Sequence, residues 1–305
     1  MSASQDVANT LLEIPEDRFF AAGEFTGIEY ALAETDFLGV AIASPPTIQL
    51  DERHELPVLL ATQQTGLRAW DVSREESSVL VAINLTSGEL YFGDPFFDPK
   101  AEEPPEDMVL PQPPKPEGAN AVALSTGVKR IDARQILDIP WQNGHYRLAA
   151  IIFDWLSNSV DVSLLGNGPE AAKRDLNAAS ADIRIEADPD ANSQLLVSGT
   201  FSTIADASHI PGSLATDAGG ETIGALVPVT LAIFAKNSTA PIRIDHVLPV
   251  YADSLLGPGS RIESRFAFDP LAASEFRLFA SDYVAYFILD GQIFGPTTFT
   301  ISDAQ

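Results

Sequence analysis

Arg130-Ile-Asp-Ala-Arg134 and Arg261-Ile-Glu-Ser-Arg265 are two copies of one short phrase, and each has an aspartate four residues further on, at Asp138 and Asp269. In both copies charged residues alternate with mostly apolar ones. Alternation with a period of two predicts a β-strand that buries one face and turns a charged face to solvent. Because the phrase recurs, we expect two structural units of similar pattern. What repeats is strand pattern rather than catalytic chemistry.

The composition favours β-structure in both units. The chain has 305 residues, which is the usual length of two domains, and 45% of them are hydrophobic. It has five Lys and two Met, so helix formers are scarce, while Thr, Val, Ile, Phe and Pro recur in short runs. We therefore predict an all-β fold of two tandem antiparallel Greek-key β-sandwiches of the immunoglobulin-like type, joined by a short helix.

The charge excludes some partners. The chain has 43 acidic and 18 basic residues, a formal net charge of −25, without a compensating basic stripe. Such a surface repels phosphate backbones, so we expect neither nucleic-acid binding nor attachment to anionic membranes. Cysteine is absent from the sequence, which leaves no disulfide, thiolate nucleophile or Cys-ligated metal. We predict no cofactor, except calcium as discussed below.

The sequence gives little on location. Residues 1–7 lack the basic and apolar regions of a secretory signal, and no run approaches the roughly 18 apolar residues of a membrane-spanning helix. No membrane insertion is expected. The compartment stays unknown, with the cytoplasm as the default.

Turn residues and apolar runs divide the chain. We predict a short helix in 1–16, a first sandwich over 17–168 with an extended acidic Pro-rich loop at 94–118, a helical linker at 169–181 and a second sandwich over 182–305. Strands are expected near 27–33, 37–43, 47–51, 57–62, 78–85, 89–92, 120–125, 128–137, 146–155 and 159–165 in the first unit. In the second unit they are expected near 194–203, 226–236, 241–248, 260–268, 275–280, 283–289 and 292–301.

Two local signals refine this picture. Asp290-Gly291 between apolar runs predicts a type I′ hairpin, because both residues tolerate positive φ angles. Gly144-His145-Tyr146 at the start of a long apolar strand resembles the tyrosine corner of immunoglobulin-like Greek-key sandwiches. Aligning the two units matches Tyr146 either with Phe276 or with Tyr283.

Candidate binding residues are few. The four histidines have no ligand-pair spacing, and no nucleophile elbow or phosphate loop occurs in the sequence. Trp141 in a turn-like segment could stack on a sugar or anchor a partner, with plugging the end of the sandwich as the favoured alternative. His145, the other candidate, lies beside the predicted tyrosine corner and is expected to be exposed. Asp188, Asp190 and Asn192 alternate as calcium ligands do, although the loop departs from an EF-hand at Ser193 and Gly199.

These observations favour a non-catalytic role. We predict a structural or protein-interaction protein that binds a protein partner or self-associates through loops and sheet edges. A carbohydrate- or ligand-binding module that binds a glycan is the first alternative. A hydrolase without a recognisable motif is the second.

Overall fold

The structure is a computed structural model that describes residues 3–21, 25–65, 78–96, 124–169, 179–187, 195–204, 224–235, 241–251, 261–272 and 278–301. Its helices are α1 (Ala3–Leu12), α2 (Glu16–Phe20), α3 (Thr26–Ala33) and α5 (Ala133–Leu137). The strands of the first half are β1 (Gly39–Ala43), β2 (Thr47–Gln49), β3 (Pro57–Thr65), β4 (Ser78–Asn84), β5 (Leu90–Gly93), β6 (Leu124–Asp132), β7 (Gly144–Ile152), β8 (Trp155–Leu156) and β9 (Val160–Leu165). Those of the second half are β10 (Ser180–Ala187), β11 (Leu195–Ile204), β12 (Gly224–Ala235), β13 (Ile242–Tyr251), β14 (Arg261–Phe268), β15 (Ser281–Leu289) and β16 (Gln292–Ile301).

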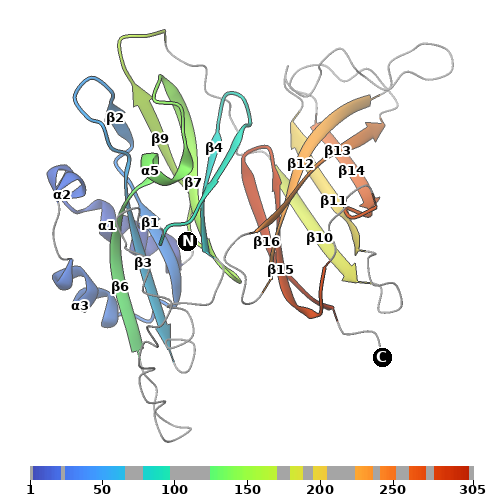
Figure 1. Ribbon diagram of the computed structural model, residues 1–305, viewed down its shortest axis with the longest axis horizontal. Helices are drawn as coiled ribbons and strands as arrows, with labels where there is room; N and C mark the ends of the chain where they lie inside the picture. The colour runs from blue at the N-terminus through green and yellow to red at the C-terminus, as the bar shows by residue number, and fades with distance from the viewer. Residues whose placement is uncertain are drawn as a thin grey trace, which may run out of the picture.

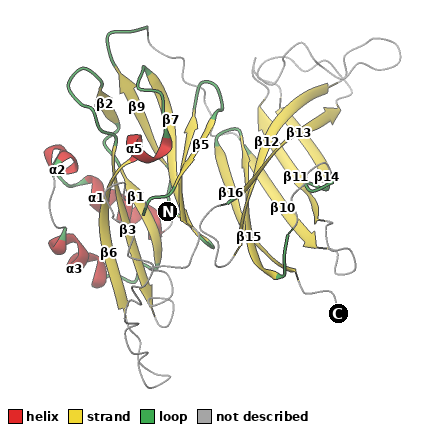
Figure 2. Ribbon diagram, viewed as in Figure 1, coloured by secondary structure: helices red, strands yellow, loops and turns green. Residues whose placement is uncertain are grey.

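The strands form two sandwiches of the same topology (Figures 1 and 2). The second pairs a sheet in the order β10-β11-β14 with one in the order β13-β12-β15-β16. The first pairs β1-β3-β6 with β2-β9-β7-β4-β5. If the short strands β2 and β8 are left out of the count, the first, second and fifth strands of each half form its smaller sheet: β1, β3 and β6 in the first half, and β10, β11 and β14 in the second. This arrangement is immunoglobulin-like, and it confirms the predicted all-β class.

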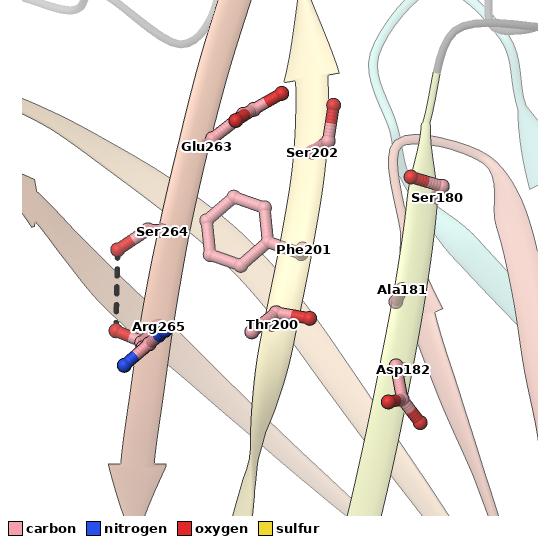
Figure 3. A pocket seen from close by; sticks show the side chains of 9 residues that line it. All are labelled: Ser180, Ala181, Asp182, Thr200, Phe201, Ser202, Glu263, Ser264 and Arg265. Atoms are coloured by element: carbon pink, nitrogen blue, oxygen red, sulfur yellow. Dashed lines mark hydrogen bonds between the residues drawn. The ribbon is translucent and has the colours of Figure 1, made fainter.

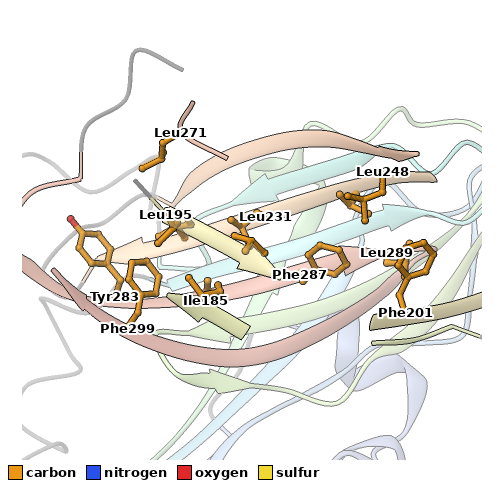
Figure 4. Close-up of a cluster of buried hydrophobic side chains, with 14 of the residues drawn as sticks. Ile185, Leu195, Phe201, Leu231, Leu248, Leu271, Tyr283, Phe287, Leu289 and Phe299 are labelled. Carbon is orange, nitrogen blue, oxygen red and sulfur yellow. The ribbon is translucent and has the colours of Figure 1, made fainter. Parts of the chain in front are cut away.

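Each sandwich has its own apolar core. The first lies between the two sheets of the first half, where Leu60, Leu80 and Leu148 are almost fully buried. The second packs Val197 and Phe201 against the facing strands β12 and β15 (Figure 4). Alternate residues of each strand supply these cores, as the pleat of a β-strand requires.

The sandwiches pack directly on each other. A third apolar cluster joins Val79 and Val81 of β4 to Phe234 of β12 and Tyr286 of β15. The ring of Phe234 meets that of Tyr286 edge-on, with centroids 5.7 Å apart, and the Tyr286 hydroxyl donates to the carbonyl of Phe153 at 2.8 Å. Strands β4, β7, β12 and β15 are therefore buried on both faces. Their near-continuous apolar sequences follow from that position.

Helices cover the far side of the first sandwich. Leu11 of α1 and Leu32 of α3 are 0% and 2% exposed and pack on the outer face of β1 and β3, where Leu59 lies. The prediction of a strand at 27–33 is therefore wrong. Ile28 and Leu32 lie four residues apart, so a helix places both toward the sheet.

A second correction concerns 128–137. The strand ends at Asp132 and the segment continues as α5, because the Asp132 carboxylate accepts a hydrogen bond from the Arg134 backbone N–H at 3.2 Å. Asp138 ends the helix in the left-handed conformation, with φ 50°. The repeated phrase thus begins in β6 in the first half, whereas the second copy lies entirely in β14, its topological equivalent.

The tyrosine corner forms in the second sandwich. The Tyr283 hydroxyl donates to the Phe279 carbonyl at 2.8 Å and accepts from the Phe279 N–H at 3.1 Å. This is the backbone bond that defines a tyrosine corner. Tyr146 starts the equivalent strand β7, but its hydroxyl interacts with Asn84 instead. The structure thus supports the match of Tyr146 with Tyr283. Burial raises the pKa of both phenols above the usual value.

The predicted hairpin at Asp290-Gly291 is confirmed, with φ angles of 48° and 69° and Leu289 paired with Gln292. Several expectations fall outside the described residues: most of the acidic loop 94–118 and most of the linker helix 169–181. The last residues assigned to that linker, from Ser180 on, belong to strand β10 instead.

Candidate interaction surface

Within the part of the chain that the structure describes, one sheet has an outer face that no helix or second sheet covers. Each sandwich has two outer faces, one on each sheet. The outer face of β1-β3-β6 lies under the helices. The two larger sheets bury the outer sides of their central strands β4, β7, β12 and β15 against each other, while outward positions of the flanking strand β13, such as Asp245 and Val247, stay exposed. The remaining face, the outer side of β10-β11-β14, we call the bare face. It presents Ser180, Asp182, Arg184, Glu186, Leu196, Ser198, Thr200, Ser202, Ile204, Arg261, Glu263, Arg265 and Ala267, all of which are at least partly exposed.

Strand β10 explains why this face stays open. Its outward positions are polar or charged throughout, while Ile183 and Ile185 point to the second core. A strand of this pattern buries one side only. The prediction missed β10, although its strict alternation is the signal that could have found it.

The charges on the bare face form rows across the sheet. The register aligns Asp182 with Thr200 and Arg265, and the next row aligns Ser180 with Ser202 and Glu263. The outward charges are the acids Asp182, Glu186 and Glu263 and the bases Arg184, Arg261 and Arg265. Three acids thus meet three bases in a chain whose net charge is −25. The bare face is locally balanced.

A shallow hollow of about 560 Å³ lies on this face. Figure 3 shows its lining, which includes Asp182, Thr200 and Arg265 from three neighbouring strands. Gly199 precedes Thr200 in β11, and a Cβ at this position would collide with the Asp182 carbonyl oxygen. Glycine is therefore required for the close approach of β10 and β11.

Two large apolar side chains flank the hollow. Leu196 and Ile204 lie near opposite ends of β11 and are 44% and 45% exposed. Between them the outward residues of β11 are the short polar Ser198, Thr200 and Ser202. The bare face therefore combines an uncharged central strand with charged flanking strands.

The sequence-predicted binding residues lie elsewhere, at the end of the first sandwich. Trp141 packs against the first core, and the Arg134 guanidinium covers its ring at 4.6 Å from the centroid. Its buried Nε1 has no hydrogen-bond partner among the described residues. This arrangement supports the plug interpretation. His145 was expected to be exposed, and this is wrong: it is 8% exposed, with Nδ1 2.8 Å from the Ser163 hydroxyl.

The remaining candidates do not assemble into a described site. His246 stacks on Phe268 at 4.1 Å, and burial lowers its pKa below the usual value. No group of three His, Asp or Glu side chains that could hold a metal occurs within the stretches that the structure describes. Asp188, Asp190 and Asn192, the predicted calcium ligands, lie outside those stretches. No described helix is both long and apolar enough to cross a membrane.

A second hollow, of about 270 Å³, lies at the rim of the junction between the sandwiches. It is lined by the turn around Ser87 and Gly88 and by Thr230. Polar contacts hold this rim together: Arg243 donates to the Leu90 carbonyl at 3.3 Å and pairs with Asp245 at 3.0 Å. We interpret this hollow as part of the junction.

Comparisons with known proteins find a structural match to the chain but no sequence relative. No family model matches it, and no curated protein matches it. Among solved structures, it is similar to the selenomethionine-substituted chicken interferon gamma receptor alpha chain, at 9% identity over 87% of this chain and 97% of that chain. The TM-score is 0.19, too low to support an argument about fold or function.

Proposed function

We propose that the protein is a non-catalytic interaction protein, in which two sandwiches form one rigid body that presents the bare face to a protein partner or to a second copy of the chain. The observation that supports this is the contrast among the four outer sheet faces. One is covered by helices and two are covered over their central strands by the other sandwich, whereas the fourth is exposed along all three of its strands, hollowed and balanced in charge.

The junction supports the proposed rigidity. Phe234 and Tyr286 are 0% exposed between the sandwiches, and Arg147, 9% exposed, pairs with Asp161 at 2.8 Å while donating to the Gly291 carbonyl at 3.5 Å. Domains joined by a large apolar interface move together. The bare face is therefore held at a fixed distance from the helices, as an interaction surface needs.

Site-specific photo-crosslinking tests this function. A benzophenone amino acid at Thr200, in the hollow, should yield adducts with a protein in the cells that produce the chain. The matched control is the same amino acid at Tyr30, 72% exposed on α3. Mass spectrometry identifies the captured protein, whether a second copy or another chain. Equal capture from both positions, or none from Thr200, would contradict the proposal.

A further inference from the structure

We infer that the bare face binds a second copy of this chain, through a two-fold axis that runs parallel to strand β11. The inference rests on the proposed function, because it names the partner of the same face. It is argued from the register of the three strands, the distribution of their charges and the size of the face.

The register makes the face complementary to itself. Asp182 and Arg265 lie at one height, on either side of Thr200. A two-fold axis along β11 lays β10 of one copy over β14 of the other without shifting that height. Asp182 of each copy then faces Arg265 of the other, so the pair forms twice. An in-plane axis across the strands would place Asp182 over Asp182, and the charges therefore select the first arrangement.

The central strand fits the same axis. Each outward residue of β11 lies opposite the same residue of the second copy. The exposed Leu196 side chains of the two copies therefore contact each other at one end of β11, and the exposed Ile204 side chains do so at the other. Ser180 falls opposite Glu263 and can donate to its carboxylate. Between the ends the short side chains of Ser198 and Thr200 let the sheets approach to the roughly 10 Å of stacked sheets.

Net charge points to the same surface. Two copies that each carry −25 repel one another, and the repulsion is smallest where acids and bases alternate. The bare face has three of each. Its three strands cover about 14 Å by 26 Å per copy, or roughly 700 Å² for both together. That size predicts weak association, with a dissociation constant on the order of 100 µM.

Sedimentation velocity on the purified full chain tests the inference, at about 10 µM to 1 mM protein and about 0.3 M NaCl, which screens the long-range repulsion. The wild type should dimerise. Asp182→Arg and Arg265→Asp should each weaken dimerisation at least about tenfold, since each replaces two attractive pairs by two repulsive ones. The control is Arg18→Asp, at an exposed position on α2. It changes the net charge by the same amount as Arg265→Asp and should leave dimerisation unchanged.

The decisive sample is a mixture of the two single variants. The Asp182→Arg variant has arginine at both positions, 182 and 265, and the Arg265→Asp variant has aspartate at both. In a mixture each arginine of one variant therefore faces an aspartate of the other. The two should form a heterodimer of wild-type affinity, although each variant alone is monomeric. The double variant with both changes should dimerise as well. A wild type that stays monomeric at about 1 mM, or variants that do not rescue each other, would overturn the inference. If Thr200 meanwhile captures a different protein in cells, the proposed function stands and only the identity of the partner is wrong.

Discussion

The outer faces of β1-β3-β6 and β10-β11-β14 occupy equivalent places in the two sandwiches, yet one is covered and the other is bare. Leu59 lies in β3, between Ala43 and Arg130, and is 0% exposed beneath the helices. Thr200 lies mid-strand in β11, between Asp182 and Arg265, and is exposed. The topology is shared. The outward side chains alone decide whether a sheet face is covered by helices or faces solvent.

The repeated phrase shows the same difference. In the first copy Arg130 donates to the Phe19 carbonyl at 2.5 Å and pairs with Glu55, which ties β6 to α2 and to the loop before β3. In the second copy Arg261 pairs at 2.6 Å with Glu263 on its own strand, and both side chains are mostly exposed. One sequence pattern therefore holds a helical cover in the first sandwich and forms a solvated face in the second.

The largest effect is expected from placing a charge on the outward side of the central strand of each sheet. Leu59→Asp buries a carboxylate without a partner and should lower the free energy of unfolding by about 4 kcal/mol or more. Thr200→Asp places the same group in solvent and should lower it by only about 1 kcal/mol, the cost of replacing a good strand residue by a poor one. Urea unfolding followed by tryptophan fluorescence measures both. Similar losses at the two positions would mean that the faces do not differ as described.

Truncation of α1 sharpens the comparison. Leu11 is 0% exposed against the sheet, so Leu11→Ala should cost about 2 to 4 kcal/mol. The matched control is Leu12→Ala, because Leu12 is adjacent but 42% exposed, and its truncation should cost less than about 0.5 kcal/mol. Thermal unfolding measures the difference. If Leu11→Ala costs no more stability than its control, the packing of α1 on the sheet does not stabilise the fold.

The edge of the covered sheet is sealed by a side chain. The Asn158 amide accepts from the Ile42 N–H and donates to the Ile42 carbonyl, both at 2.9 Å. Asn158→Ala leaves both buried backbone groups unpaired and should cost about 2 kcal/mol. Asn167→Ala, at an exposed amide bonded to Asp51 at 2.6 Å, should cost less than about 0.5 kcal/mol and serves as the control. Equal costs would mean that water replaces the Asn158 bonds.

The smallest effect concerns the two equivalent tyrosines. Burial raises the folded-state pKa of Tyr146 and Tyr283 above the unfolded value near 10, so both favour the neutral phenol. Their contribution is fully present below pH 10 and is lost as the pH rises further, because the unfolded chain ionises first. Tyr146→Phe and Tyr283→Phe should each flatten the loss of stability above pH 10, measured by urea unfolding. A wild type with constant stability from pH 9 to 11 would contradict this.

Much of the architecture could be predicted because the relevant signals are local. Alternation identified β14, and the Asp290-Gly291 turn gave the final hairpin, since both depend on neighbouring residues only. The helix α3 was misassigned because Ile28 and Leu32 show a helical period only once the sheet beneath them is known. The junction was missed although Val79 to Ile83 is continuously apolar, a sign of burial on both faces that alternation does not register.

The bare face was harder to predict than the fold, because it is identified only by the absence of helices or a second sheet packed against it. Nothing in Thr200 or Arg265 alone distinguishes them from other exposed residues. Their significance depends on the helices and on the other sandwich, which cover the remaining faces. Trp141 was a candidate because it lies in a turn-like segment, yet its ring packs against the first core and is covered by Arg134, so a turn-like sequence is a poor guide to exposure.

The helical cover has a consequence for assembly size. A β-sandwich protein that exposed a self-binding sheet face at both ends could add copies without limit and form a filament. Here the helices that carry Leu11 and Leu32 cover the sheet face at one end, so that face cannot bind another copy. Growth by face-to-face stacking would therefore stop after a single addition, and the product would be a finite particle.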